Sequence, residues 1–144
     1  MIVLAVDPGE KRIGIAISDQ LGLTAQGLKT LRRRSTDDDL REIATIISQF
    51  EINKIVVGLP KNMNGTLGEQ AESVLRWTEV LKHKTQLPVY TRDERLSTVG
   101  ASKVLLEADL SRRKRKKVVD KLAAVLILQG YLDQSKRKDH DTLS

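Results

Sequence analysis

The chain of 144 residues contains no cysteine, which excludes disulfides, thiolate metal sites and cysteine nucleophiles. Histidine occurs only twice, at His83 and His140, and neither residue stands in a cluster typical of a metal site. A metal site in this chain must therefore be built from oxygen ligands, and such ligands favour Mg²⁺ or Mn²⁺.

Aromatic residues are also scarce, with one phenylalanine, one tryptophan and two tyrosines, so the sequence does not indicate base stacking as a strong theme. It contains no signal peptide and no hydrophobic run long enough to span a membrane. We therefore expect a cytoplasmic protein without a membrane partner. Hydrophobic residues make up 40% of the chain, which suits one domain with a real core.

The hydrophobic pattern predicts an α/β domain with a five-stranded mixed sheet flanked by helices. Three consecutive strands should form an antiparallel meander, and right-handed crossovers should then place two further strands parallel to the first. The predicted strands cover residues 1–7, 12–18, 23–30, 55–59 and 88–94, and the predicted helices cover residues 36–50, 69–84, 97–107 and 118–128. Thr36 or Asp37 is expected to cap the first helix. The domain should comprise residues 1–134, followed by a flexible polar tail at 135–144.

Asp7 is the most informative residue, because it closes the first apolar run and precedes Pro8 and Gly9. A carboxylate at the tip of a buried strand is costly unless something compensates its charge. A metal ion, or a phosphate-bearing ligand held through a metal, would do so. An Asx turn that caps the following hairpin is the structural alternative.

Further acidic residues fall where the topology brings segments together. Asp93 and Glu94 end the fifth strand, and Asp120 lies in an otherwise apolar helical segment. Ion pairs with neighbouring arginines or lysines, or helix capping, would also explain these residues. Carboxylates brought close together repel one another unless cations separate them. Two divalent ions held by such a cluster would suit hydrolysis of a phosphodiester, without a histidine or cysteine.

The formal net charge of +6 is concentrated in two runs, Arg32 to Arg34 and Arg112 to Lys117. Each run alone is explained by a solvated surface. Two runs beside an acidic cluster favour a phosphate backbone as the partner.

Four motifs together resemble the YqgF family, also called RuvX-like, whose members have the ribonuclease H-like fold. They are DPGEKRIGIA at 7–16, GLPKNMNG at 58–65, DERLST at 93–98 and DKLAAVLILQ at 120–129. The resemblance implies a metal-dependent nuclease that acts in 5′-end maturation of the 16S ribosomal RNA precursor. It implies that Asp7, Glu94 and Asp120 bind Mg²⁺ or Mn²⁺ and are catalytic, with Asp93 as an alternative ligand.

Nucleic acid is the expected partner, either precursor ribosomal RNA or branched DNA. The residues expected to bind it are Arg12, Lys61, Asn64, Arg95, Arg113, Arg115 and Lys116. A Holliday junction resolvase is the main alternative function, although Gly58-Leu59 and Lys117 stand where a RuvC-type resolvase would carry further acids. A resolvase would need a symmetric dimer, whereas an RNA nuclease would not, so both monomer and homodimer remain open.

Two other function classes fit parts of the sequence. The turn from Asp7 to Gly14 is similar to the phosphate-binding hairpin of actin-like ATPases, but those proteins clamp the nucleotide between two domains, and this chain has one. A ribosome-associated binding protein without catalysis would use the basic runs equally well. It would leave Asp120 in its apolar surroundings unexplained.

Overall fold

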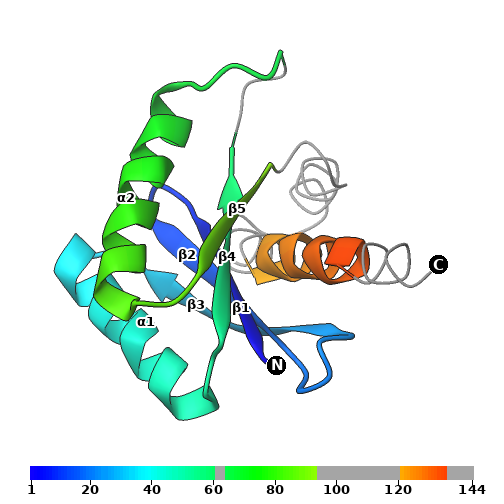
Figure 1. Cartoon of the computed structure of the whole chain (residues 1–144). Coiled ribbons are helices and arrows are strands. Elements are labelled where there is room, and N and C mark those ends of the chain that lie inside the picture. The colour runs from blue at the N-terminus through cyan, green and yellow to red at the C-terminus, as the bar shows by residue number, and fades with distance from the viewer. Residues whose placement is uncertain (61–63, 94–120, 136–144) are drawn as a thin grey trace, which may run out of the picture.

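The computed structural model describes residues 1–60, 64–93 and 121–135, and this part of the chain forms one sheet with helices on both faces (Figure 1). The strands are β1 (Val3–Pro8), β2 (Arg12–Ser18), β3 (Ala25–Arg32), β4 (Lys54–Leu59) and β5 (Val89–Asp93). The helices are α1 (Thr36–Phe50), α2 (Glu69–Thr85) and a C-terminal helix at residues 121–135, drawn in orange. The predicted helix at 97–107 lies outside the described residues.

The strand order is β3-β2-β1-β4-β5, which confirms the predicted mixed sheet. β1 pairs antiparallel with β2, and β2 does so with β3, whereas β1–β4 and β4–β5 are parallel pairs. The carboxyl ends of β1, β4 and β5 therefore lie at one edge of the sheet, which we call the carboxyl edge. Ligands of open α/β sheets bind at such an edge.

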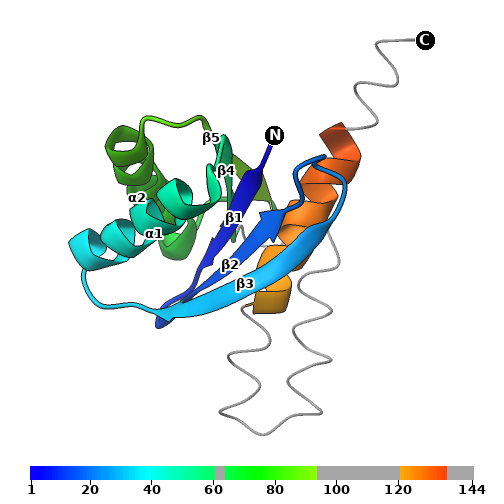
Figure 2. The same ribbon diagram turned by 90° about the horizontal axis from the view of Figure 1, so that it is seen from below.

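Two hydrophobic cores cover the two faces of the sheet. α1 and α2 pack on one face and the C-terminal helix packs on the other (Figures 1 and 2). Because strand side chains alternate, Leu4 and Val6 of β1 enter the α1/α2 core, while Val3 and Ala5 enter the core under the C-terminal helix. This alternation assigns a face to each candidate site residue that lies on a described strand.

The C-terminal helix approaches the sheet closely through small side chains. Ala123 and Ala124 are buried, and a Cβ atom at Gly27 of β3 would lie 2.5 Å from Cε of Lys121. Near the other end of the helix, Gln129 accepts a hydrogen bond from the Ala25 amide at 2.9 Å. The helix therefore runs antiparallel to β1, with its amino-terminal end toward the carboxyl edge (Figure 2).

Local details differ from the sequence predictions. Ser35, not Thr36 or Asp37, caps α1, since its Oγ accepts a hydrogen bond from the Asp38 amide at 3.1 Å. Trp77 was not predicted to face inward on α2, yet it is buried. The C-terminal helix continues from Leu128 to residue 135, where the tail was expected to begin. In the described residues, no helix is long and apolar enough to cross a membrane.

Candidate active site

Asp7 lies near the end of β1 and is 5% exposed. It shares a face with Val3 and Ala5, so its side chain belongs to the side of the sheet that the C-terminal helix covers. The turn after it closes tightly, because the Gly9 amide donates a hydrogen bond to the Arg12 carbonyl at 2.8 Å. A buried carboxylate thus lies on the central strand at the carboxyl edge, as the sequence predicted.

The strand positions on both sides of Asp7 are glycines. Gly14 of β2 pairs directly with Asp7, and the β1–β4 register places Gly58 beside it, one position beyond the Val6–Val57 pair. Gly58 in turn pairs with Arg92 of β5. Glycine within a strand often marks a site where a ligand approaches the backbone closely. The two strand positions beside Asp7 therefore carry no side chain. This leaves space for a bound cation or phosphate next to the carboxylate.

The last two residues of β5, Arg92 and Asp93, lie on opposite faces of the sheet. Nη1 of Arg92 donates a hydrogen bond to Oε1 of Gln134 at 2.6 Å, so Arg92 shares the face of Asp7. Asp93 follows it and has the same parity as Val89, which packs against the α1/α2 core. The structure therefore does not bring Asp7 and Asp93 to the same face of the sheet.

Two further arginines, besides Arg92, lie on the face of Asp7. Arg12 was predicted to bind nucleic acid, and it pairs with Arg32 of β3. Ile13 and Leu31 enter the α1/α2 core, so the preceding Arg12 and the following Arg32 belong to the opposite face, with Asp7. Arg32 was noted in the sequence only as part of a basic run.

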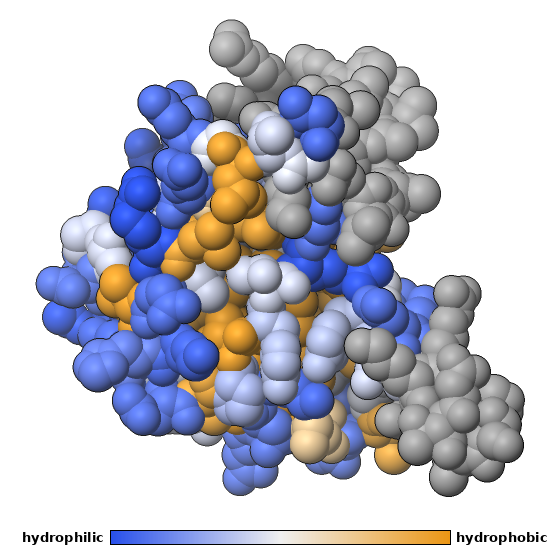
Figure 3. All heavy atoms as spheres, turned by 45° about the horizontal axis from the view of Figure 1, so that its top comes forward, coloured by the Kyte–Doolittle hydropathy of each residue, from blue (hydrophilic) through white to orange (hydrophobic). Residues whose placement is uncertain are grey.

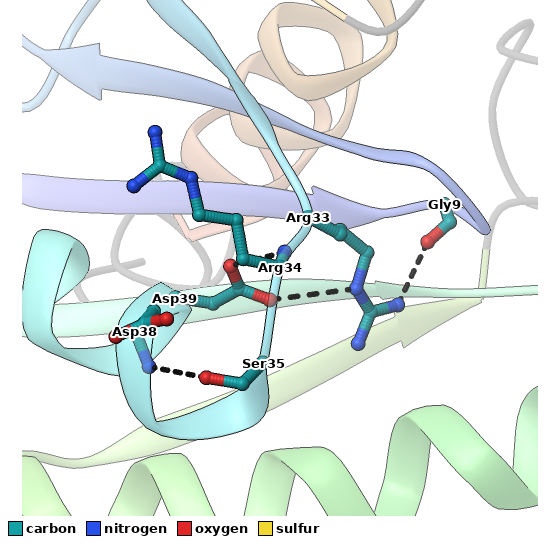
Figure 4. A network of polar contacts seen from close by, with 6 residues as sticks. All are labelled: Gly9, Arg33, Arg34, Ser35, Asp38 and Asp39. Carbon is teal, nitrogen blue, oxygen red and sulfur yellow. Dashed lines mark hydrogen bonds and ion pairs between the residues drawn. The ribbon is translucent and has the colours of Figure 1, made fainter.

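The basic run Arg32 to Arg34 is not a uniform solvated surface, because Arg33 has a structural role (Figure 4). Its Nη1 donates a hydrogen bond to the Gly9 carbonyl at 2.7 Å, and its Nε lies 3.7 Å from Oδ2 of the buried Asp39. Its guanidinium also lies over the Trp77 ring, 5.9 Å from the centroid. Arg33 therefore connects the turn that follows Asp7 with the start of α1 through these contacts.

Replacing Arg33 by alanine should lower the free energy of unfolding by about 1–3 kcal/mol, since Asp39 would stay buried without this guanidinium. Arg34→Ala is the matched control, because Arg34 joins the network through its backbone N–H and its side chain points away (Figure 4). The control should change stability by less than about 0.5 kcal/mol. Urea denaturation measures both variants. Equal midpoints for them would show that Arg33 does not brace the turn.

Other predicted site residues are placed differently or lie outside the described part of the chain. Oδ1 of Asn64 accepts hydrogen bonds from the Thr66 amide at 3.1 Å and from its hydroxyl at 2.6 Å, so Asn64 shapes the loop before α2. The predicted residues outside the described ranges are Lys61, Glu94, Arg95, Arg113, Arg115, Lys116 and Asp120. Within residues 1–60, 64–93 and 121–135 no three metal-ligating side chains cluster.

A pocket of about 420 Å³ lies beside the turn that follows Asp7. Pro8, Gly9 and Arg33 line one side of it, and the first turns of α2 line the other. Figure 3 shows one face of the molecule, with hydrophobic surface near the middle of the view and hydrophilic residues around it. Sequence spacing contained no signal for this pocket, since it forms between segments far apart in the chain.

Similar solved structures define the fold class. RuvC of Thermus thermophilus in complex with a Holliday junction substrate matches with a TM-score of 0.58 at 16% identity, covering 94% of this chain and 96% of that one. The fowlpox virus Holliday junction resolvase matches with a TM-score of 0.54 at 16% identity, covering 93% and 99% of the two chains. The domain has the ribonuclease H-like fold of these resolvases.

The family follows from the sequence as a whole. The model of the RuvX family, described as Holliday junction resolvase, matches residues 1–134, and the chain belongs to this family. A relative from Desulforamulus reducens is 56% identical over 133 residues, which cover 92% of this chain and 97% of the relative. A relative from Clostridioides difficile is 57% identical over 131 residues, covering 91% and 93%. Both are named "Putative pre-16S rRNA nuclease". The resemblance inferred from the four motifs is thereby confirmed.

Proposed function

We propose that this protein is a nuclease that hydrolyses phosphodiester bonds in the precursor of 16S ribosomal RNA, during maturation of its 5′ end. The observation that carries the proposal is the buried Asp7, set between Gly14 and Gly58 on the central strand at the carboxyl edge. The names of the two relatives at 56% and 57% identity support the nuclease class and the RNA substrate.

The residues present fit a divalent cation. Asp7 offers an oxygen ligand, which Mg²⁺ and Mn²⁺ prefer, and its burial makes a nearby cation favourable. We propose that Asp7, Glu94 and Asp120 hold the ion. When bound, such an ion activates water and stabilises the charge that develops on the phosphate oxygens. Asp7 would hold the ion from the central strand of the sheet.

The described elements support Glu94 over Asp93 as the second ligand. Arg92 shares the face of Asp7, whereas Asp93 belongs to the other face and is therefore poorly placed to share a bound ion with Asp7. The position of Asp120 in the sequence supports the third ligand. It directly precedes Lys121, and that end of the C-terminal helix points toward the carboxyl edge.

Basic residues around the proposed carboxylate ligands would bind the phosphates of the substrate. Arg12 and Arg32 share the face of Asp7 and suit the backbone next to the cleaved bond. We propose that Lys61, Arg95, Arg113, Arg115 and Lys116 extend this surface. The proposal includes one domain over residues 1–134, a cytoplasmic location and action as a monomer or homodimer. The match of the family model to residues 1–134 supports that domain boundary.

Resolution of Holliday junctions is the second candidate, favoured by the description of the family model and by the resolvase-like fold. The residue beside Asp7 on β4 argues against this second candidate. Gly58 occupies the end of β4 where the RuvC pattern would place a further acid, and it contributes no ligand. A dimer able to make paired cuts would be required for this activity.

Cleavage by the purified protein should require Mg²⁺ or Mn²⁺ and should favour a precursor RNA over a four-way DNA junction. The metal-free protein should lose about three orders of magnitude or more in rate, since the ion supplies several kcal/mol of transition-state stabilisation. Each substrate is tested with either ion, and then in excess chelator followed by restored metal. Full activity in chelator would overturn the proposal, and cleavage of the junction alone would select the second candidate.

A further inference from the structure

An aromatic cluster with a lysine lies on the same face of the sheet as Asp7. Tyr90 of β5 stacks on Tyr131 of the C-terminal helix, with ring centroids 6.1 Å apart and an interplanar angle of 26°. Nζ of Lys54 lies 5.8 Å from the centroid of the Tyr131 ring and 3.4 Å from its hydroxyl. The chain has only two tyrosines, and this cluster contains both of them.

Packing of the helix against the sheet does not account for Tyr90. The residue is 47% exposed, so about half of its surface stays open to solvent beside its contact with Tyr131. Next to the cluster, Lys54 and Tyr131 line a pocket of about 360 Å³, together with Leu21 and Leu23. Leu21 is 79% exposed and Leu23 is 43% exposed. A half-exposed tyrosine, a cation and a pocket of mixed polar and apolar lining thus adjoin one another.

The cluster also lies within reach of the candidate active site. Tyr90 and Arg92 are two residues apart on β5 and share a face, and Arg92 stands across Gly58 from Asp7. With strands about 4.8 Å apart and a rise of about 3.3 Å per residue, the Cα atoms of Tyr90 and Asp7 are about 12 Å apart. A nucleic acid strand bound at Asp7 reaches Tyr90 within a few nucleotides.

We propose that Tyr90, supported by Tyr131 and Lys54, stacks on an unpaired base of the strand whose phosphodiester is cleaved at Asp7. This inference rests on the proposed nuclease function and specifies its substrate: a strand with unpaired nucleotides next to the cleavage site. A ring face binds a base whose own face is free, and base pairs within a duplex are already stacked on their neighbours. Lys54 contributes a positive charge for the phosphates of that segment.

Binding of a labelled single-stranded oligoribonucleotide that contains 2-aminopurine tests the stacking directly, in chelator so that the RNA stays intact. Tyr90→Leu keeps an apolar side chain against Tyr131 but removes the aromatic face. It should weaken binding about 5- to 150-fold and abolish the quenching of 2-aminopurine fluorescence. Tyr90→Phe should retain both properties. Val80→Ala on α2 is the matched control, because Val80 is also 47% exposed but lies on the helix that covers the opposite face.

Two further measurements separate the possible failures. A blunt duplex of the same sequence should bind wild type and Tyr90→Leu equally, and thermal melting should show both to be folded. With Mn²⁺ present, Tyr90→Leu should raise KM and leave kcat nearly unchanged. If wild type cleaves RNA but Tyr90→Leu binds the single strand as tightly, the stacking proposal is wrong and the rings serve helix packing or a protein contact. An equal loss for the duplex also overturns it. If wild type neither binds nor cleaves RNA, the proposed function fails and the stacking proposal fails with it.

Discussion

Asp7→Asn should abolish cleavage while leaving the fold intact. Asparagine has nearly the same shape as aspartate but lacks the charge that would hold a divalent cation. Loss of that interaction removes several kcal/mol of transition-state stabilisation, so the rate should fall about a thousandfold or more. Single-turnover cleavage of a precursor RNA at saturating Mn²⁺ measures this loss. Cleavage at the wild-type rate would eliminate Asp7 as a ligand.

The metal dependence of stability provides an independent readout of the same residue. An ion that binds the folded protein at 100 times its Kd stabilises it by about 2.7 kcal/mol, so Mn²⁺ should raise the Tm of wild type by several degrees. Asp7→Asn should lose this increase. Without metal, the variant should stay folded with a Tm close to that of wild type, because asparagine nearly preserves the shape of the side chain. A large drop in Tm without metal would instead assign Asp7 a structural role.

The fold could be predicted because its determinants are local. The apolar runs of β1, β2 and β4 define strands, and the spacing of Leu40, Ile43 and Ile46 defines the buried face of α1. The position of Asp7 at the carboxyl edge followed from topology alone, since it lies near the end of a strand that is parallel to β4 and, beyond it, to β5. These features depend on periodicity and chain order, which the sequence contains directly.

The features that escaped prediction depend on register and on contacts between distant segments. Nothing near Arg33 in the chain indicates that it reaches the carbonyl of Gly9, and the run of three arginines suggested a single exposed surface. The low aromatic content argued against base stacking, but it did not reveal that Tyr90 of β5 and Tyr131 of the C-terminal helix meet on one face of the sheet. The row in which Gly14, Asp7 and Gly58 are neighbours also required the pairing of three strands.

The contacts of Arg33 that support the turn after Asp7 connect the stability of the fold with the candidate active site. Arg33 contacts the Gly9 carbonyl, the Asp39 carboxylate and the Trp77 ring, and these groups come from the β1–β2 turn, α1 and α2. The turn is thereby held by both helices that cover the α1/α2 core. The catalytic role proposed for Asp7 would require its carboxylate to stay within a fraction of an ångström of a productive position, and support from surrounding elements favours such rigidity.

Glu94→Gln should reduce cleavage about a thousandfold, whereas Asp93→Asn should retain it within a factor of about ten. The two acids are adjacent in the sequence, and each substitution removes one carboxylate charge with little change in shape. Their expected difference comes from β5, where Arg92 lies against Gly130 and Gln134 on the face of Asp7 while Asp93 belongs to the other face. Single-turnover rates and calorimetric Mn²⁺ titration should be measured for both variants. A severe loss in Asp93→Asn with little change in Glu94→Gln would exchange their roles and place the ion on the α1/α2 side of the strand. Severe losses in both would indicate that the end of β5 contributes two ligands.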